Sequence, residues 1–330
     1  MMEIIQTLAL LSFITLPIIF VAKYEREKDF RLSIIAQDNH ETTTYEDVNL
    51  QTAIQIDEET KDQKKAIINI CFYFIIFFLF VYVIFAVASK IYLSANGISI
   101  DSLVQDSEEY IAIENDLNLI VNIFTYLIAV IGVVIISFKW IKKDLSTMTG
   151  KCIGYGFLGL AIMLGVNVIA TIILQLFGIT DTSTNQSSIE QIMKSDNGLL
   201  LMGITTIILA PIVEELVFRK SIFKLFKNKI YLALVVSSLA FGALHVISPA
   251  LSTLLEIFQG NATYTDLIKE LFYLIPYSLM GLPFGFVYIK TNKNITTAII
   301  AHMLNNIFSF ISIIILPYIE KLLEQYSQFM

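Results

Sequence analysis

The stretch AIINICFYFIIFFLFVYVIFAVAS, residues 66–89, runs for 24 residues without a charged side chain. At about 1.5 Å per residue, a helix of this length is longer than the roughly 30 Å hydrocarbon core of a bilayer. The whole chain has the same character, with 56% hydrophobic residues, 15% charged residues and a mean hydropathy of +0.71. Soluble globular domains are far less apolar. The sequence therefore predicts a protein whose main partner is the lipid bilayer.

Further apolar stretches of similar length occur along the chain, and they predict an all-α fold, a polytopic transmembrane bundle of about eight spanning helices. The predicted spans are approximately 4–22, 66–89, 117–138, 154–178, 198–218, 231–255, 271–289 and 295–318. The first has no basic segment before it and no small-residue cleavage site after it, so we expect a spanning helix rather than a signal peptide. We divide the chain into N-terminal spans, 1–150, with a mobile, partly helical polar loop at 23–65, and a core at 151–330.

The basic residues predict how the bundle is oriented. When the loops between the eight spans are assigned alternately to two sides, 18 of the 22 Lys and Arg residues fall on one side and 4 on the other. Short cytoplasmic loops accumulate Lys and Arg. The sequence thus predicts that both termini lie outside. Its composition is typical of a bacterial chain, which suggests the plasma membrane.

Charged residues inside the spans are rare until the segment PIVEELVFRK (211–220), where Glu214, Glu215 and Arg219 occur at the end of the predicted span 198–218. Glu215 and Arg219 are four residues apart and can pair on one helix face, whereas Glu214 points about 100° away. An ionisable residue within a membrane helix indicates a functional site. The alternative, an ion network that only anchors the helix end, stays open for this segment.

Two of the three histidines, His245 and His302, also lie within predicted spans. Phe241 precedes His245 by four residues, so its ring can pack against the imidazole. Asn306 follows His302 by four residues, and Asn305 is the competing choice three residues away. A glutamate pair, two imidazoles and an amide within the membrane favour a site that transfers protons over ordinary core packing.

Residues that shape the neighbouring helices accompany these polar groups. Pro211 lacks a backbone N–H and precedes the Glu pair, so it permits a kink there. Gly281 and Gly285 lie four apart around Pro283 and form a small-residue face that allows another helix to approach closely.

Three motifs occur in order on successive predicted spans, within residues 195–318. They are Glu214-Glu215-x-x-x-Arg219, Phe241-x-x-x-His245 and His302-x-x-x-Asn306. This order and spacing resemble the CAAX protease and bacteriocin-processing (CPBP, or Abi) family, which includes the type II CAAX prenyl endopeptidases. The first four spans resemble no family that we can name.

The resemblance implies an intramembrane glutamate-type endopeptidase that hydrolyses a peptide bond without a metal or other cofactor. It implies that Glu214 activates a water molecule with help from His245. His302 and Asn306 would donate hydrogen bonds to the oxyanion, and Glu215 with Arg219 would hold the helix. The expected substrate is a hydrophobic, leader-bearing or membrane-associated peptide, or a membrane protein. We expect no nucleic acid among the partners.

Three other functions remain open. One Glu and two His could hold Zn²⁺ with a water ligand, although the chain has no H-E-x-x-H motif. A bacteriocin immunity or scaffolding protein could keep the family fold without cutting a peptide. A transporter could use the same Glu and His residues as a proton relay.

Counting residues along each span predicts how deep the polar groups lie. If the cytoplasmic boundary is at Arg219 and at Ile295, Glu214 and His302 are roughly 8 to 11 Å inside the membrane. A span that starts at Tyr231 places His245 about 20 Å inside. His245 therefore does not fit the same depth, unless its helix enters the membrane later.

Overall fold

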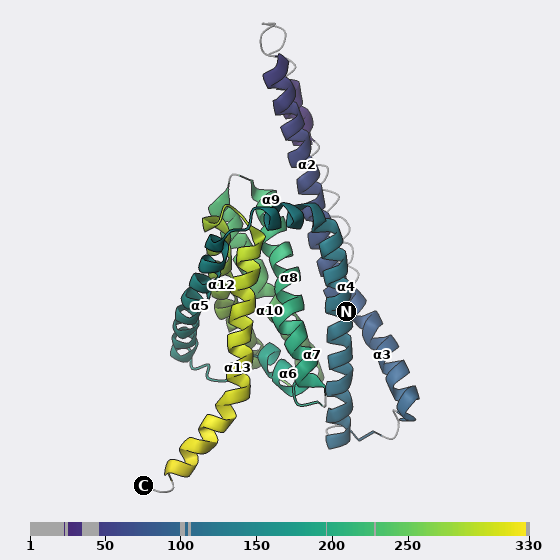
Figure 1. The fold of residues 1–330 in the computed structure, drawn as a ribbon. Helices are drawn as coiled ribbons and strands as arrows, with labels where there is room; N and C mark the ends of the chain where they lie inside the picture. The colour runs from purple at the N-terminus through teal and green to yellow at the C-terminus, as the bar shows by residue number, and fades with distance from the viewer. Residues whose placement is uncertain are drawn as a thin grey trace.

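The computed structural model is a bundle of long helices, and the residues that it describes contain no strand (Figure 1). The described residues are 23, 26–34, 46–99, 103–104, 107–195, 197–227 and 229–327. The α-helices are α2 (Glu46–Ile75), α3 (Val81–Asn96), α4 (Glu108–Ser146), α5 (Gly150–Leu176), α6 (Thr184–Ile192), α7 (Gly198–Ile204), α8 (Ala210–Glu215), α9 (Ile222–Phe226), α10 (Ile230–Gln259), α11 (Tyr264–Phe272), α12 (Leu274–Lys290) and α13 (Ile295–Ser327). Within the described residues, three π-helical segments interrupt them: η1 (Ile76–Phe80), η3 (Thr205–Leu209) and η4 (Leu216–Ser221).

Seven helices in the described part of the chain are long and apolar enough to cross a membrane. They are Gln51–Asn96, Glu108–Ser146, Gly150–Leu176, Gly198–Phe226, Ile230–Gln259, Tyr264–Lys290 and Ile295–Leu316. Each matches one predicted span, and the remaining predicted span, 4–22, lies outside the described residues. The protein is therefore an all-α, multi-pass membrane protein, as the sequence predicts.

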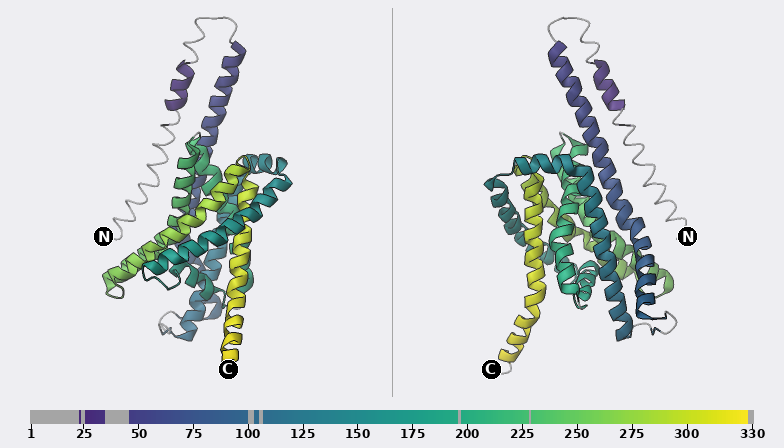
Figure 2. Two further views of the ribbon diagram at one scale, coloured as in Figure 1. Left: turned by 90° about the vertical axis from the view of Figure 1, so that its left-hand side faces the viewer. Right: turned by 45° about the vertical axis from the view of Figure 1, so that its right-hand side comes forward.

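The described part of the polar segment 23–65 is helical, because α2 already begins at Glu46 and projects well beyond the bundle (Figures 1 and 2). Residues 26–34 are also helical. Lys28 pairs with Asp57 at 2.8 Å, and Arg31 pairs with Glu59 at 3.0 Å. The second half of the predicted loop is thus the start of a spanning helix, and ion pairs attach a shorter helix to it.

The end of the bundle near α9 is rich in lysine and is held by a buried carboxylate. Asp144 pairs with Lys220 at 2.5 Å and accepts the backbone N–H of Ile295 at 2.8 Å, which joins α4, η4 and the start of α13. A cavity at this end has five lysines in its wall. They are Lys143, Lys220, Lys224, Lys227 and Lys293. All five belong to the side for which the sequence predicts a cytoplasmic location.

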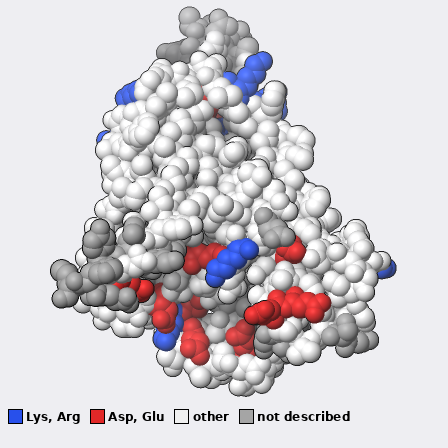
Figure 3. Space-filling model, turned by 60° about the horizontal axis from the view of Figure 1, so that its bottom comes forward, with Lys and Arg blue, Asp and Glu red and all other residues white. Residues whose placement is uncertain are grey.

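The opposite end of the bundle is acidic. Figure 3 shows Asp and Glu side chains gathered there with few basic ones among them. Exposed members include Glu108, Glu109 and Asp181. The separation of charge between the two ends agrees with the pattern in the sequence, while the assignment of one end to the cytoplasm stays a prediction.

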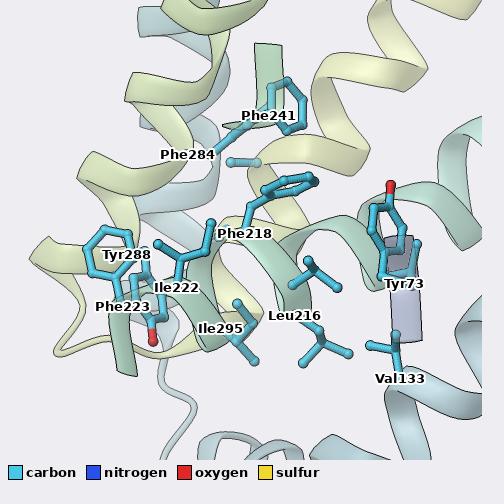
Figure 4. Packing of buried hydrophobic residues seen from close by; sticks show 14 of the residues in the cluster. Tyr73, Val133, Leu216, Phe218, Ile222, Phe223, Phe241, Phe284, Tyr288 and Ile295 are labelled. Atoms are coloured by element: carbon cyan, nitrogen blue, oxygen red, sulfur yellow. The ribbon is translucent and has the colours of Figure 1, made fainter. Parts of the chain in front are cut away.

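One hydrophobic core joins the two parts into which we divided the chain (Figure 4). Tyr73 and Val133 come from the first 150 residues, and Leu216, Phe218 and Phe284 come from the rest. The Tyr73 and Phe218 rings meet edge to face with centroids 5.8 Å apart. The N-terminal spans therefore pack directly against the helices that carry the motifs. The boundary at residue 150 falls between α4 and α5 and stays a prediction.

Helices α10 and α12 approach each other closely at glycines, which confirms the predicted small-residue contact. A Cβ atom on Gly281 would lie 2.7 Å from the Cα of Ser238, and one on Gly242 would lie 2.7 Å from the backbone nitrogen of Ser278. Contacts this short with backbone atoms cannot be relieved by moving a side chain. The spacing of α10 and α12 thus depends on the absence of side chains at these positions.

Candidate active site

The helix that carries Glu214 and Glu215 is continuous from Gly198 to Phe226. It contains a π-helical turn, η3, on the N-terminal side of this Glu pair. In η3 the N–H of Ala210 bonds to the carbonyl of Thr205, five residues earlier. The next donor in this pattern would be Pro211, which has no N–H, so the Thr206 carbonyl lacks its backbone partner. The side-chain amide of Asn306 donates to that carbonyl at 2.7 Å. The predicted kink at the proline is therefore a π-helical turn that α13 supports.

Glu215 and Arg219 form the predicted pair, and both side chains are fully buried. The guanidinium donates to Glu215 at 3.0 Å and to the carbonyl of Gly281 at 2.9 Å. It also lies over the rings of Phe241 and Phe284, at 4.7 and 5.2 Å from their centroids. A buried charge is stable only when it is paired and hydrogen-bonded. Arg219 meets this condition through groups from three separate helices.

His302 continues this network toward Glu214. Its Nδ1 lies 2.9 Å from the Glu215 carboxylate, and its ring stacks on Phe284 at a centroid distance of 4.5 Å. An ionised carboxylate only accepts hydrogen bonds, so Nδ1 carries a proton and Nε2 is the free ring atom. Nε2 faces Glu214 at a distance of 4.0 Å from its Oε2. The pair thus presents one imidazole nitrogen and one carboxylate oxygen to the same small space.

Glu214 is 2% exposed and receives a hydrogen bond from a helix outside the three motifs. The Tyr126 hydroxyl of α4 lies 3.1 Å from its Oε1. The sequence analysis missed Tyr126. The signal that could have found it is the four-residue spacing of Asn118, Asn122 and Tyr126 within an apolar span, which places polar groups on one helix face.

His245 packs against Phe241, whose ring also lies beside the Arg219 guanidinium. Its Nδ1 donates to the carbonyl of Phe241 at 2.9 Å, and the two rings are 4.7 Å apart, as the spacing predicts. Tyr277 stacks on its other face at 4.6 Å. The Phe241 ring also meets that of His302 at 5.7 Å. One phenyl ring therefore contacts both imidazoles and fixes their positions.

Asn306 is hydrogen-bonded to groups other than His302 and Glu214 in this structure. Its side-chain nitrogen donates to the Thr206 carbonyl, and its side-chain oxygen accepts a hydrogen bond from Asn305 at 3.2 Å. The geometry gives Asn306 a contact with the backbone of η3. Its predicted contact with an oxyanion stays a prediction.

The contacts of the polar groups show that they lie at one level of the bundle. Glu214 lies near the middle of the helix Gly198–Phe226, and His245 lies near the middle of α10. His302 of α13 contacts Glu215 at 2.9 Å and the ring of Phe241, which also packs on His245. How deep this level lies in the membrane stays a prediction.

Among the residues that the structure describes, no group of three or more His, Cys, Asp or Glu side chains is arranged so that it could hold a metal ion.

Comparison with known proteins identifies a family to which this part of the chain is similar. Residues 196–308 match the family model described as type II CAAX prenyl endopeptidase Rce1-like. This segment of the chain is similar to Rce1-like domains. It contains all three motifs, whereas Tyr126 lies before it. The buried network around Glu214 therefore includes a residue from outside the matched segment.

Two curated proteins are similar to parts of the chain. The "Putative membrane peptidase YdiL" of Bacillus subtilis (strain 168) is 31% identical over 154 residues, which cover 46% of this chain and 51% of that protein. An uncharacterized protein of Mycoplasma capricolum is 28% identical over 122 residues, which cover 37% of this chain and 30% of that protein. The match thus spans about half the length of the first relative and less of the second. No solved structure matches the chain significantly.

Proposed function

We propose that the protein is an intramembrane endopeptidase that uses water activated by glutamate and histidine to hydrolyse a peptide bond. The observation that carries the proposal is the buried pair of Glu214 Oε2 and His302 Nε2, 4.0 Å apart. The similarity to Rce1-like domains and the membrane peptidase among the relatives support a protease in general. The proposed substrate is a hydrophobic, leader-bearing or membrane-associated peptide.

The geometry suggests how Glu214 and His302 divide the chemistry. A water molecule hydrogen-bonded to both gives a proton to the Glu214 carboxylate while its oxygen attacks the carbonyl carbon of the peptide. Glu214 then passes that proton to the amide nitrogen as the C–N bond breaks. The Glu215 carboxylate, held by Arg219, keeps the His302 ring in the orientation that this step needs, as the carboxylate of a catalytic triad does.

His245 supplies the second imidazole of the proposed site. Because the Nδ1–H of His245 donates to the Phe241 carbonyl, Nε2 is the atom left to contact the reacting groups. In the neutral ring this atom accepts hydrogen bonds, so His245 can help Glu214 to orient the attacking water. This is the role that the resemblance implies for His245.

The proposed reaction needs no cofactor, and the alternative is a zinc-bound water. Activity of the purified protein before and after treatment with a chelator separates the two. We expect full activity after chelation. Loss of activity that added Zn²⁺ restores would show that the metal-free proposal is wrong.

The function is tested by comparing the peptides of cells that carry the wild-type protein or the Glu214→Gln variant. We expect at least one peptide product to disappear in the variant. Glu256→Gln, which changes an exposed carboxylate on α10, is the matched control and should leave every product in place. Identical peptide patterns in wild type and Glu214→Gln would favour a non-catalytic immunity or scaffolding protein.

We also propose that the membrane is a bacterial plasma membrane and that the lysine-rich end faces the cytoplasm. Both curated relatives are bacterial. The five lysines around one cavity, opposite an acidic end, are the distribution that cytoplasmic loops favour (Figure 3).

A further inference from the structure

A cleft runs along α4 from the centre of the bundle toward the acidic end. Its walls come from α4, from η1 and the start of α3, and from α6. The residues that line it are Phe77, Val81, Asn118, Val121, Asn122, Thr125, Tyr126, Ser188 and Ile192. Apolar and uncharged polar side chains alternate in this wall, and none of its residues is charged.

The inner end of the cleft lies against the proposed catalytic group. The rings of Phe77 and Tyr126 meet edge to face at 5.0 Å and both line the cleft. The hydroxyl of the same Tyr126 is bonded to Glu214. A molecule in the cleft would therefore be separated from Glu214 by the width of one aromatic side chain.

Two buried acceptors in the wall have no hydrogen-bond partner within the described part of the chain. They are Oδ1 of Asn122 and the hydroxyl oxygen of Thr125, which is itself 3% exposed. A helical threonine commonly bonds to the carbonyl four residues earlier, as Thr171 does on α5. Thr125 makes no such bond. A buried polar atom without a partner is unfavourable unless a ligand satisfies it.

We propose that this cleft binds the main chain of an extended peptide substrate and leads it to Glu214. This inference rests on the proposed function. Asn122 and Thr125 accept backbone N–H groups of the peptide, and apolar wall residues such as Val81 and Ile192 contact its side chains. From Asn118 to Tyr126 the cleft is about 12 Å long, which accommodates about four residues of extended chain.

The outer wall of the cleft is linked to His245. Helix α6 contributes Ser188 and Ile192 to the wall. Its N-cap residue, Ser183, bonds to the hydroxyl of Tyr277 at 2.8 Å, and the Tyr277 ring stacks on His245. A peptide that contacts α6 therefore contacts an element that also positions the second imidazole.

The test uses short, internally quenched hydrophobic peptides and the full-length protein in nanodiscs. The peptide that wild type cleaves fastest is labelled, and its binding to the Glu214→Gln protein is measured by fluorescence anisotropy. We expect Asn122→Ala and Thr125→Val, each added to Glu214→Gln, to weaken binding about fivefold, the loss expected for one hydrogen bond. The matched controls Asn96→Ala and Thr171→Val change exposed residues and should leave binding unchanged.

A second measurement begins with changes to the peptide rather than to the protein. The amide nitrogens of the peptide are methylated one at a time, which removes single N–H donors. If the peptide donates to Asn122 and Thr125, we expect methylation to weaken binding at only one or two of the amide nitrogens. Methylation at the site paired with Asn122 should cause no further loss in Asn122→Ala, because the two changes remove the same bond.

The possible outcomes separate the cleft from the function. If peptides are cleaved but neither the wall variants nor methylation alters binding selectively, the cleft does not hold the substrate and the proposed function stands. A lipid tail in the cleft would give this result. If wild type neither cleaves nor binds any of the peptides, the proposed function fails and the inference fails with it.

Discussion

At the scale of single residues, the environment of Glu214 combines a donor on one side with an imidazole on the other. Tyr126 holds Oε1, and His302 faces Oε2. A carboxylate held in this way keeps one oxygen directed at the reacting groups, which is what a general base requires. The orientation is set by two helices that are far apart in the sequence, α4 and α13.

Replacing Tyr126 with Phe tests that orientation. The ring keeps its contact with Phe77, so we expect the protein to fold, with a lower melting temperature because a buried oxygen of Glu214 loses its partner. The loss of the hydrogen bond to a carboxylate, worth about 1.5–3 kcal/mol, should lower kcat/KM about tenfold or more. Tyr82→Phe, at a residue that is 69% exposed, should behave as wild type. Full activity of Tyr126→Phe would show that the hydroxyl does not position the base.

Among the elements, the helix from Gly198 to Phe226 depends on a side chain from α13. Asn306→Ala leaves the Thr206 carbonyl without a partner, which should cost about 1–3 kcal/mol in the free energy of unfolding. In a Pro211→Ala background the new N–H can take that carbonyl. The same Asn306→Ala change should then cost about 1 kcal/mol less, as an unfolding double-mutant cycle would measure.

The activity of the same four proteins separates support of the helix from catalysis. If Asn306 acts only through Thr206, the double variant should regain activity that Asn306→Ala loses. Strictly additive unfolding energies, with no recovery of activity, would instead favour direct contact between Asn306 and the substrate.

The contact of α10 with α12 gives a second prediction at this scale. Gly281→Ala should destabilise the protein by about 1–3 kcal/mol or more, because the new Cβ meets the backbone of Ser238. Gly285→Ala is the matched comparison. Its Cβ would meet the tip of the flexible Leu234 side chain at 2.3 Å, which can move. Thermal unfolding of both variants should rank Gly281→Ala as the less stable, and the reverse order would contradict the packing described here.

For the whole molecule, the charge at each end predicts the orientation in the membrane. In a protein whose Cys71 and Cys152 are replaced by Ala, single cysteines are introduced at Ser146, near the lysine-rich end, and at Asp181, at the acidic end. Both positions are exposed. A maleimide that cannot cross membranes should label the Asp181→Cys protein in intact cells and the Ser146→Cys protein only after permeabilisation. Labelling in the opposite order would reverse the proposed topology.

The sequence predicts those features of this molecule that depend on neighbours along one helix. The spans follow from uninterrupted apolar runs, and the pairing of Glu215 with Arg219 follows from a spacing of four residues. The helix continues beyond the predicted end of the span at residue 218 to Phe226, and Arg219 and Lys220 are paired there with buried carboxylates. Tyr126 could not be assigned to Glu214, since that contact joins residues 88 positions apart.

The π-helical segments have a consequence for the rotational phase of the helix that carries Glu214. A π-helical turn holds an extra residue, and each residue corresponds to about 100° of rotation in an α-helix. If η3 reverted to regular α-helix by losing that residue, α8 would rotate about its own axis relative to α7. Glu214 would then turn away from Tyr126 and His302 together. The rotational position of Glu214, the proposed base, thus depends on the hydrogen bond from Asn306 of α13 to the Thr206 carbonyl of η3.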